Sequence, residues 1–207
     1  MGEVGALQLL PKDSEFSDSE DLQNLPEDEA ERIQFLKEKG AVRFDEMYNM
    51  VAVLGVGGFG VVVACKNKHN NRKYALKIVQ YDADHPTQDA LSLIREQKLL
   101  QTIKHPNIIK VYPPKQRYHN YIVMKMELAE ESLSQFIGKY EERHGTRAIP
   151  EETCAKIMLG LFRALQHLHD NVNMIHRDVK LENIVIGSHN NYAKVKLIDF
   201  GLAVQSE

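Results

Sequence analysis

Cysteine is scarce in this sequence, and long apolar runs and concentrated positive charge are missing from it. The two cysteines in 207 residues, Cys65 and Cys154, are isolated and show no Cys-x-x-Cys spacing. This excludes a disulfide framework and a cysteine zinc cluster, and a reducing compartment is expected. No apolar run approaches the ~20 residues of a membrane span, and no secretory signal is visible. We therefore expect an intracellular protein, cytoplasmic or nuclear, with no membrane partner.

Charge is distributed unequally along the chain. Residues 1–31 carry ten Asp or Glu against one Lys, a net charge of −9, whereas the remainder carries 25 basic and 19 acidic residues, or +6. A surplus of +6 is too small to indicate a nucleic-acid partner. Residues 1–25 predict an acidic disordered tail. Ser17 and Ser19 stand among acids, which is compatible both with phosphorylation by an acid-directed kinase and with an unmodified solubilising tail. Residues 26–47 predict a helical extension.

The pattern changes to β-strands near residue 48. Apolar runs at 50–54, 61–65 and 74–79 predict a meander of three strands. Its first connection, residues 55–60, reads Gly-x-Gly-x-x-Gly, and the missing Cβ atoms let backbone N–H groups approach phosphate oxygens.

A dinucleotide-binding turn has the same glycine spacing but continues into a helix. Here the β-branched residues Val61, Val62 and Val63 follow and favour a strand. Asp82 and Asp84 do lie near the acidic position of the Rossmann fingerprint, so that alternative stays open.

One lysine and one glutamate stand among apolar residues. Strand alternation places Lys77 on one face with Ala75 and Val79. In the helix predicted after Pro86, Glu96 interrupts a stripe of apolar residues located three positions before it and four and seven positions after it. Either charge is costly to bury alone, so we expect an ion pair between Lys77 and Glu96.

Two further helices are predicted. Residues 132–143 form a short one, and a long amphipathic helix begins near Pro150 with the apolar stripe Ile157, Leu161, Leu165 and Leu168. His167 and His169 are two residues apart and point to different faces, so we expect no shared metal site there.

The densest polar pattern lies after this helix. Residues 176–183 read His-Arg-Asp-Val-Lys-Leu-Glu-Asn, and residues 199–201 read Asp-Phe-Gly after a strand-like run. Transfer of a γ-phosphoryl group needs a carboxylate near the attacking hydroxyl, a cation near the phosphate and two oxygen ligands for Mg²⁺. Those roles fall, in that order, to Asp178, Lys180, Asn183 and Asp199.

These motifs resemble the catalytic loop and metal-binding turn of the protein kinase family, and Lys180 resembles its serine/threonine branch. The resemblance implies an α+β fold, with a small lobe at residues 48–127 that contains a five-stranded antiparallel sheet and a helix C. A partial, mainly helical large lobe would follow at residues 128–207. The resemblance also implies ATP and Mg²⁺ as cofactors, the catalytic residues Asp178, Lys180, Lys77 and Glu96, and the metal ligands Asn183 and Asp199.

The resemblance also assigns a nucleotide-binding surface. Met124 would be the gatekeeper, and in the hinge the carbonyl of Lys125 and the N–H of Glu127 would face the adenine. Glu131 or Ser132 would contact the ribose. The predicted cofactor-binding set is Leu54, Gly55, Gly57, Gly58, Phe59, Gly60, Val62, Ala75, Lys77, Met124, Lys125, Glu127 and Val185.

The sequence stops six residues after Gly201, where relatives would continue through an activation segment and further helices. We therefore expect a truncated form in which the stripe of the long helix is uncovered and available to a regulatory partner.

Three functions follow. The first is an ATP-dependent serine/threonine protein kinase core that phosphorylates a protein substrate. The alternative is a non-catalytic, ATP-binding regulatory module, since the nucleotide-binding parts are present and those that bind peptide are absent. A structural scaffold fits least, because it needs none of the four catalytic side chains.

Overall fold

The computed structural model describes residues 28, 31, 34, 47–57, 60–82, 84–113, 121–187 and 192–206. The predicted acidic tail, nearly all of the predicted helical extension, and Gly58 and Phe59 lie outside these residues.

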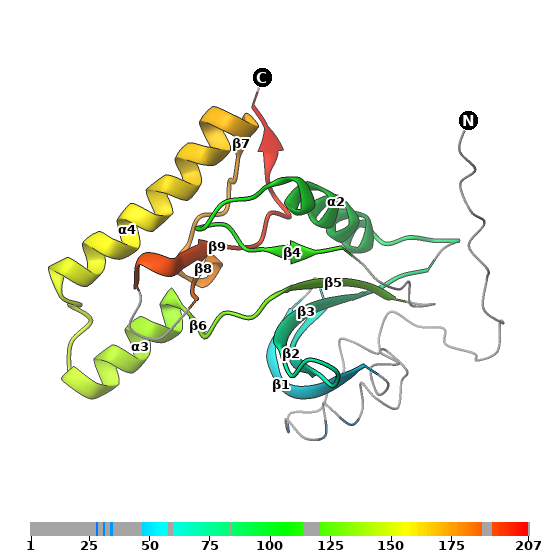
Figure 1. The fold of residues 1–207 in the computed structure, drawn as a ribbon, viewed down its shortest axis with the longest axis horizontal. Coiled ribbons are helices and arrows are strands. Elements are labelled where there is room, and N and C mark those ends of the chain that lie inside the picture. The colour runs from blue at the N-terminus through cyan, green and yellow to red at the C-terminus, as the bar shows by residue number, and fades with distance from the viewer. Residues whose placement is uncertain are drawn as a thin grey trace.

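A five-stranded antiparallel sheet forms one half of the fold, at the lower right of Figure 1. In chain order its strands are β1 (Tyr48–Gly57), β2 (Gly60–Asn67), β3 (Lys73–Gln80), β4 (Val111–Tyr112) and β5 (Tyr121–Glu127). Their order in the sheet is β1-β2-β3-β5-β4. The three predicted strands and the α+β class are confirmed.

The two faces of this sheet belong to different cores. Leu76 and Ile78 of β3 are buried in a cluster with Val61 and Val63 of β2, whereas Val79 belongs to the larger core. The smaller cluster includes Cys65, and burial raises the pKa of its thiol to about 12. That cysteine is therefore an inert packing residue.

Helix α2 (Gln88–Thr102) packs on the sheet, against β3, β4 and β5 (Figure 1). Thr87 caps its N-terminus by accepting the N–H of Ala90 at 3.2 Å. Leu93 and Leu100 are buried in the larger core, and Glu96 is buried on the same stripe, as the sequence predicts.

The second half is mainly helical, with two small sheets. Its longer helices are α3 (Leu133–His144) and α4 (Glu151–Gln166), and α4 continues into the π-helical turn η2 (His167–Asn171). The short elements are β6 (Glu131–Ser132), β7 (Met174–Ile175), η3 (Leu181–Asn183), β8 (Ile184–Ile186), η4 (Tyr192–Lys194), β9 (Val195–Leu197) and β10 (Val204–Gln205). The small sheets are β6-β8-β9 and β7-β10.

The expectation that the stripe of α4 is uncovered is wrong. Ile157, Leu161 and Leu168 are buried in the larger core, where α4 packs on η4 and β9. The large exposed apolar residues of α4 lie off this stripe and are Leu159 and Phe162. No helix in the described ranges combines the length and the apolar character needed to cross a membrane.

Gly160 allows the close approach of α4 to the rest of the core. A Cβ at this position would lie 2.5 Å from Val195 Cγ2 and 3.0 Å from Asn107 Nδ2. Asn107 is buried and donates from Nδ2 to the carbonyls of Ala193 and Val195 at 3.1 and 2.8 Å, so it has little room to move.

We expect Gly160→Ala to lower the free energy of unfolding by about 1–2 kcal/mol, because overpacking outweighs the gain in helix propensity. Gly138→Ala on α3 is the matched control, since a Cβ there meets nothing within 4 Å. The control should be stabilised by up to about 1 kcal/mol. Urea denaturation of both variants checks this. A change in the free energy of unfolding with the same sign in both variants would contradict the close packing at Gly160.

Candidate active site

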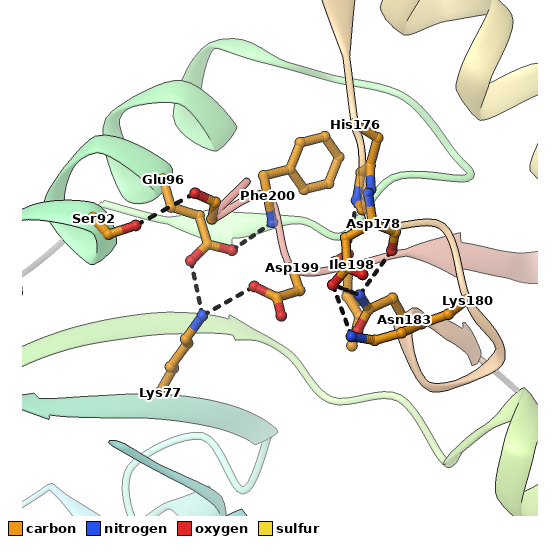
Figure 2. A network of polar contacts seen from close by, with 11 residues as sticks. Lys77, Ser92, Glu96, His176, Asp178, Lys180, Asn183, Ile198, Asp199 and Phe200 are labelled. Atoms are coloured by element: carbon orange, nitrogen blue, oxygen red, sulfur yellow. Dashed lines mark hydrogen bonds and ion pairs between the residues drawn. The ribbon is translucent and has the colours of Figure 1, made fainter. Parts of the chain in front are cut away.

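A buried ion pair joins strand β3 to helix α2. Lys77 Nζ lies 2.9 Å from Glu96 Oε2, so the ion pair predicted from the sequence is present, and 3.3 Å from Asp199 Oδ1 (Figure 2). The side chains of Lys77 and Glu96 are 16% and 3% exposed. Two carboxylates thus compensate one ammonium group for the water it loses on burial.

These neighbours also determine the charge state of Lys77. Burial, the largest effect, lowers the pKa of the ammonium group, but the attraction of Glu96 and Asp199 and their hydrogen bonds together outweigh it. The net pKa is raised, so Lys77 is charged at neutral pH.

Glu96 also holds the segment after β9. Its Oε1 accepts the N–H of Phe200 at 2.9 Å (Figure 2). Ser92, one turn earlier on the same face of α2, brings Oγ to 3.5 Å from the carbonyl oxygen of Gly201. Sequence reasoning missed Ser92, although its spacing of four residues from Glu96 was a visible signal.

The catalytic-loop residues contact one another directly. Asp178 Oδ2 lies 2.8 Å from Lys180 Nζ and accepts Asn183 Nδ2 at 2.8 Å, and the Asp178 carbonyl accepts the same amide at 2.9 Å. The hydrogen bond from Lys180 is the main cause that lowers the pKa of Asp178, which is therefore ionised at neutral pH.

His176 connects this loop to the segment before Asp199. It is 1% exposed, its Nε2 contacts the carbonyl of Ile198 at 3.0 Å, and its Nδ1 accepts the N–H of Asp178 at 3.2 Å. An acceptor at Nδ1 requires the neutral tautomer protonated at Nε2, which then donates to Ile198. The ring of Phe200 packs edge-on against the imidazole, with 4.7 Å between the ring centroids.

Two residues of the site have left-handed backbone conformations without being glycine. Arg177 has φ +65° and Asp199 has φ +61°. Such conformations are costly and persist where neighbouring contacts hold them. The holding contacts are the bond from Arg177 Nε to the Leu202 carbonyl at 2.7 Å and the bond from Phe200 to Glu96.

Gly57 and Gly60 lie at the end of the β1–β2 hairpin. Strand pairing of β1 with β2 extends to Gly57 opposite Gly60. Gly60 has φ +108°, and a Cβ there would collide with the carbonyl oxygen of Ile78. Glycine at this position therefore lets the hairpin lie against β3.

Three predicted nucleotide-binding residues of the sheet share a face with Lys77. Val62 and Met124 are the strand partners of Lys77 on β2 and β5, and Ala75 lies two residues before it on β3. Partner residues and i, i+2 residues point to the same side of a sheet. Three other predicted contacts lie elsewhere, two exposed on β1 and one buried on β8: Leu54, Gly55 and Val185.

The hinge prediction is wrong for Glu127. Strand β5 continues to this residue, and its N–H donates to the carbonyl of Lys110 at 3.0 Å, so it is not available to an adenine ring. The physical reason is pairing with β4, which places Lys110 beside this end of β5. The chain leaves the sheet at residues 128–130.

Lys125 of the predicted hinge directs its side chain to the face opposite Lys77. Its Nζ lies 4.9 Å from the centroid of the Tyr74 ring and 5.2 Å from that of Tyr112. These are cation–π distances, and they give the cationic residue a structural role that the sequence did not reveal.

The two candidates for ribose contact also have other partners. Ser132 Oγ caps α3 by accepting the N–H of Gln135 at 3.2 Å. Glu131 Oε2 lies 2.9 Å from Lys139 Nζ. Because the Ser132 hydroxyl is used to cap the helix, Glu131 is the better candidate for ribose contact.

We expect His176 to make the fold sensitive to acid. Burial is the main cause that lowers its pKa below the ordinary 6.5. Because the unfolded ring binds a proton more readily, this contribution to stability is complete above about pH 6.5 and is lost as the pH falls towards the folded pKa. Urea unfolding at about pH 7.5 and about pH 5 should therefore show a loss of stability at the lower pH.

The control compares two histidine variants. His176→Gln should flatten this pH dependence, though not abolish it, since burial also lowers the pKa of His105. His69→Gln, in an exposed turn, should retain the wild-type slope. If the free energy of unfolding of the two variants depended equally on pH, His176 would be excluded as a titrating group.

Comparisons with known proteins agree with this geometry. A family model for the protein kinase domain matches residues 48–207. Calcium-dependent protein kinase 4 of Plasmodium berghei is 32% identical over 168 residues, which cover 80% of this chain and 30% of that protein. Mitogen-activated protein kinase 18 of Arabidopsis thaliana is 33% identical over 160 residues, which cover 75% of this chain and 24% of that protein. The chain thus spans less than a third of the length of these relatives.

Proposed function

Because this chain belongs to the protein kinase domain family, we propose that it is the catalytic core of a serine/threonine protein kinase, with a protein hydroxyl as the phosphoryl acceptor. The observation that carries the proposal is the polar network of Figure 2. It gathers a charged lysine, three acidic side chains and an amide from β3, α2, the loop after β7, η3 and the segment after β9, namely Lys77, Glu96, Asp178, Asn183 and Asp199.

The residues present fit ATP and Mg²⁺. The side chain of Asp199 is 40% exposed and uses Oδ1 toward Lys77, so Oδ2 is suited to a metal. Asn183 uses its amide nitrogen toward Asp178, so its amide oxygen would be the second ligand. When bound, ATP–Mg²⁺ supplies the phosphoryl group and neutralises the charge that develops during transfer. Lys77 would hold phosphate oxygens, and Glu96 keeps Lys77 in place.

The remaining roles, acceptance of the hydroxyl proton and contact with phosphate, belong to Asp178 and Lys180. Asp178 is ionised and held by Asn183, so it can orient a substrate hydroxyl and take its proton. A carboxylate with a lowered pKa is a weak base, and its main partner is the exposed Lys180. If Lys180 turns to a phosphate oxygen, Asp178 loses that hydrogen bond and becomes more basic at the moment it is needed.

We expect ATP with Mg²⁺ to raise the melting temperature of the chain by several degrees. A ligand at 100 times its Kd stabilises the native state by about 2.7 kcal/mol. Lys77→Met should remove most of this shift. Lys73→Met is the matched control, since Lys73 is an exposed residue on the same strand, and it should retain the shift.

The same assay separates the alternatives. A folded sample without an ATP-dependent shift would contradict any kinase-like function. The Rossmann alternative is already excluded by the fold, because strand β2, antiparallel to β1, follows the glycine segment where a dinucleotide-binding turn continues into a helix. An ATP shift in a chain with no phosphotransfer to protein would favour the non-catalytic regulatory module.

We also expect Asp199→Asn to weaken Mg²⁺-dependent nucleotide binding by about tenfold or more, and Asp178→Asn to leave it nearly unchanged. Asp199 is the proposed metal ligand, whereas Asp178 acts on the acceptor hydroxyl. Radiolabelled phosphotransfer should fall by about 10²-fold or more in both variants. Calorimetric titration with an ATP analogue measures the binding step, and equal losses of binding would show that the two roles are assigned wrongly.

A further inference from the structure

A surface cavity of about 370 Å³ lies apart from the network of Figure 2, where the end of α4 meets the loop after α2. None of its lining residues has a role in the proposed phosphoryl transfer. They are His105, Arg163, Gln166, His167, Asp170 and Asn171.

Helix geometry explains why five of these residues line one wall. Residues 163, 166, 167, 170 and 171 are spaced at i, i+3, i+4, i+7 and i+8, so they share one face of the continuous helix formed by α4 and η2. His105 on the opposite wall immediately precedes Pro106 and Asn107. Gly160 lets the helix approach Asn107 closely, and this brings the two walls together.

The two histidines of the cavity are in contact. The rings of His105 and His167 stack at 4.9 Å with an interplanar angle of 18°. His105 Nδ1 accepts the N–H of Asn107 at 3.1 Å, so its proton lies on Nε2, which remains a donor.

The charges around His105 are positive. Burial is the first cause that lowers its pKa, and the other three are His167, Lys196 and Arg163. Lys196 has its own partners, because its Nζ contacts the carbonyl of Pro106 at 3.0 Å and Glu127 Oε1 at 2.8 Å. Among the described residues, no carboxylate or other acceptor is paired with the Arg163 guanidinium. Asp170 is the one acidic residue in the lining.

We propose that this cavity is a binding site for a phosphate-type dianion, such as the phosphate ester of a phosphorylated side chain or of a small metabolite. Arg163 presents the planar fork of donors that suits phosphate oxygens. His105 Nε2, His167 and the amides of Gln166 and Asn171 add further donors. Asp170 opposes the anion and limits its affinity.

His105 makes this binding depend on pH. An anion beside His105 favours its protonated form and raises its pKa, although a proton on Nδ1 displaces the hydrogen bond from Asn107. A ligand that raises a pKa binds more tightly to the protonated protein, so affinity should increase as the pH falls below about 6.5 towards the lowered pKa of His105. Besides the two histidine rings, the charged groups in the lining are Arg163 and Asp170. Lys196, paired with Glu127, acts on His105 from outside the lining.

A ligand in this cavity would link two segments that lead to the proposed active site. The loop that carries His105 binds β9 on both sides of its last residue, because Leu197 N–H donates to the Asn107 carbonyl at 2.9 Å and Ile109 N–H donates to the Leu197 carbonyl at 3.0 Å. Leu197 is two residues from Asp199. An anion that contacts both walls therefore links η2, which precedes the loop of Asp178, to the loop that follows the helix of Glu96. The binding site itself does not depend on the proposed kinase activity.

Histidine NMR signals of the full chain test the proposal directly. We expect sulfate, whose charge is constant over this range, to shift the signals of His105 and His167 saturably and to bind at least several-fold more tightly at about pH 5.5 than at about pH 8. Arg163→Gln should weaken this binding by about tenfold. Arg143→Gln, an exposed arginine near the end of α3, is the matched control and should bind as the wild type does.

A second variant, expected to strengthen sulfate binding, makes the test stricter. Asp170→Asn should strengthen sulfate binding severalfold, because it removes the opposing charge without changing the shape of the side chain. The proposal is overturned if the histidine signals do not shift, if Arg163→Gln binds as Arg143→Gln does, or if Asp170→Asn binds no better than the wild type.

Two further probes identify the source of the phosphate group. They are inorganic phosphate and a peptide copy of residues 13–24 phosphorylated at Ser17 and Ser19. Equal affinity for both would assign the site to a free phosphate or small metabolite, and much tighter binding of the peptide would assign it to a phosphorylated segment. Failure of both to bind would overturn the proposal even if sulfate binds.

Discussion

The buried carboxylate of Glu96 is the interaction on which the site depends. One of its oxygens receives the ammonium group of Lys77 from the sheet, and the other receives the backbone N–H of Phe200. Loss of either contact would leave a charge buried without full compensation, which is among the costlier changes in a protein interior. Three segments far apart in the sequence are therefore held in one arrangement by a single side chain.

His176 connects this arrangement to the catalytic loop. Its imidazole bridges the Ile198 carbonyl and the Asp178 N–H, so the positions of Asp199 and Asp178 are coupled through one neutral ring. The left-handed backbone at Asp199 is tolerated because Phe200 is held by Glu96 on one side and packs against His176 on the other. The electrostatic pair and the strained turn thus support each other.

Much of the fold and the central pair could be predicted from the sequence, and the physical reasons are visible. Lys77 and Glu96 each interrupt an apolar pattern, so each required a partner. The use of the Glu127 N–H could not be predicted, because it depends on β4, a strand of two residues whose sequence has little periodicity. The burial of the α4 stripe was also missed, since a periodic pattern shows that a face is apolar but does not identify what covers it. The polar wall from Arg163 to Asn171 was readable as helical spacing, but its opposite wall, His105, is nearly 60 residues away.

The division of the interior into two cores affects how the molecule opens. Helix α2 is adjacent to the sheet, yet its buried leucines belong to the larger core together with α4, β8 and β9, while β1, β2 and much of β3 depend on the smaller cluster. Cooperative unfolding units follow shared cores rather than proximity in the chain. Amide hydrogens of the β1–β2 hairpin should therefore exchange with solvent as one group, and those of α2 should exchange with the helical half. Partial opening of the hairpin would separate Gly60 from β3 without releasing Glu96 from its core.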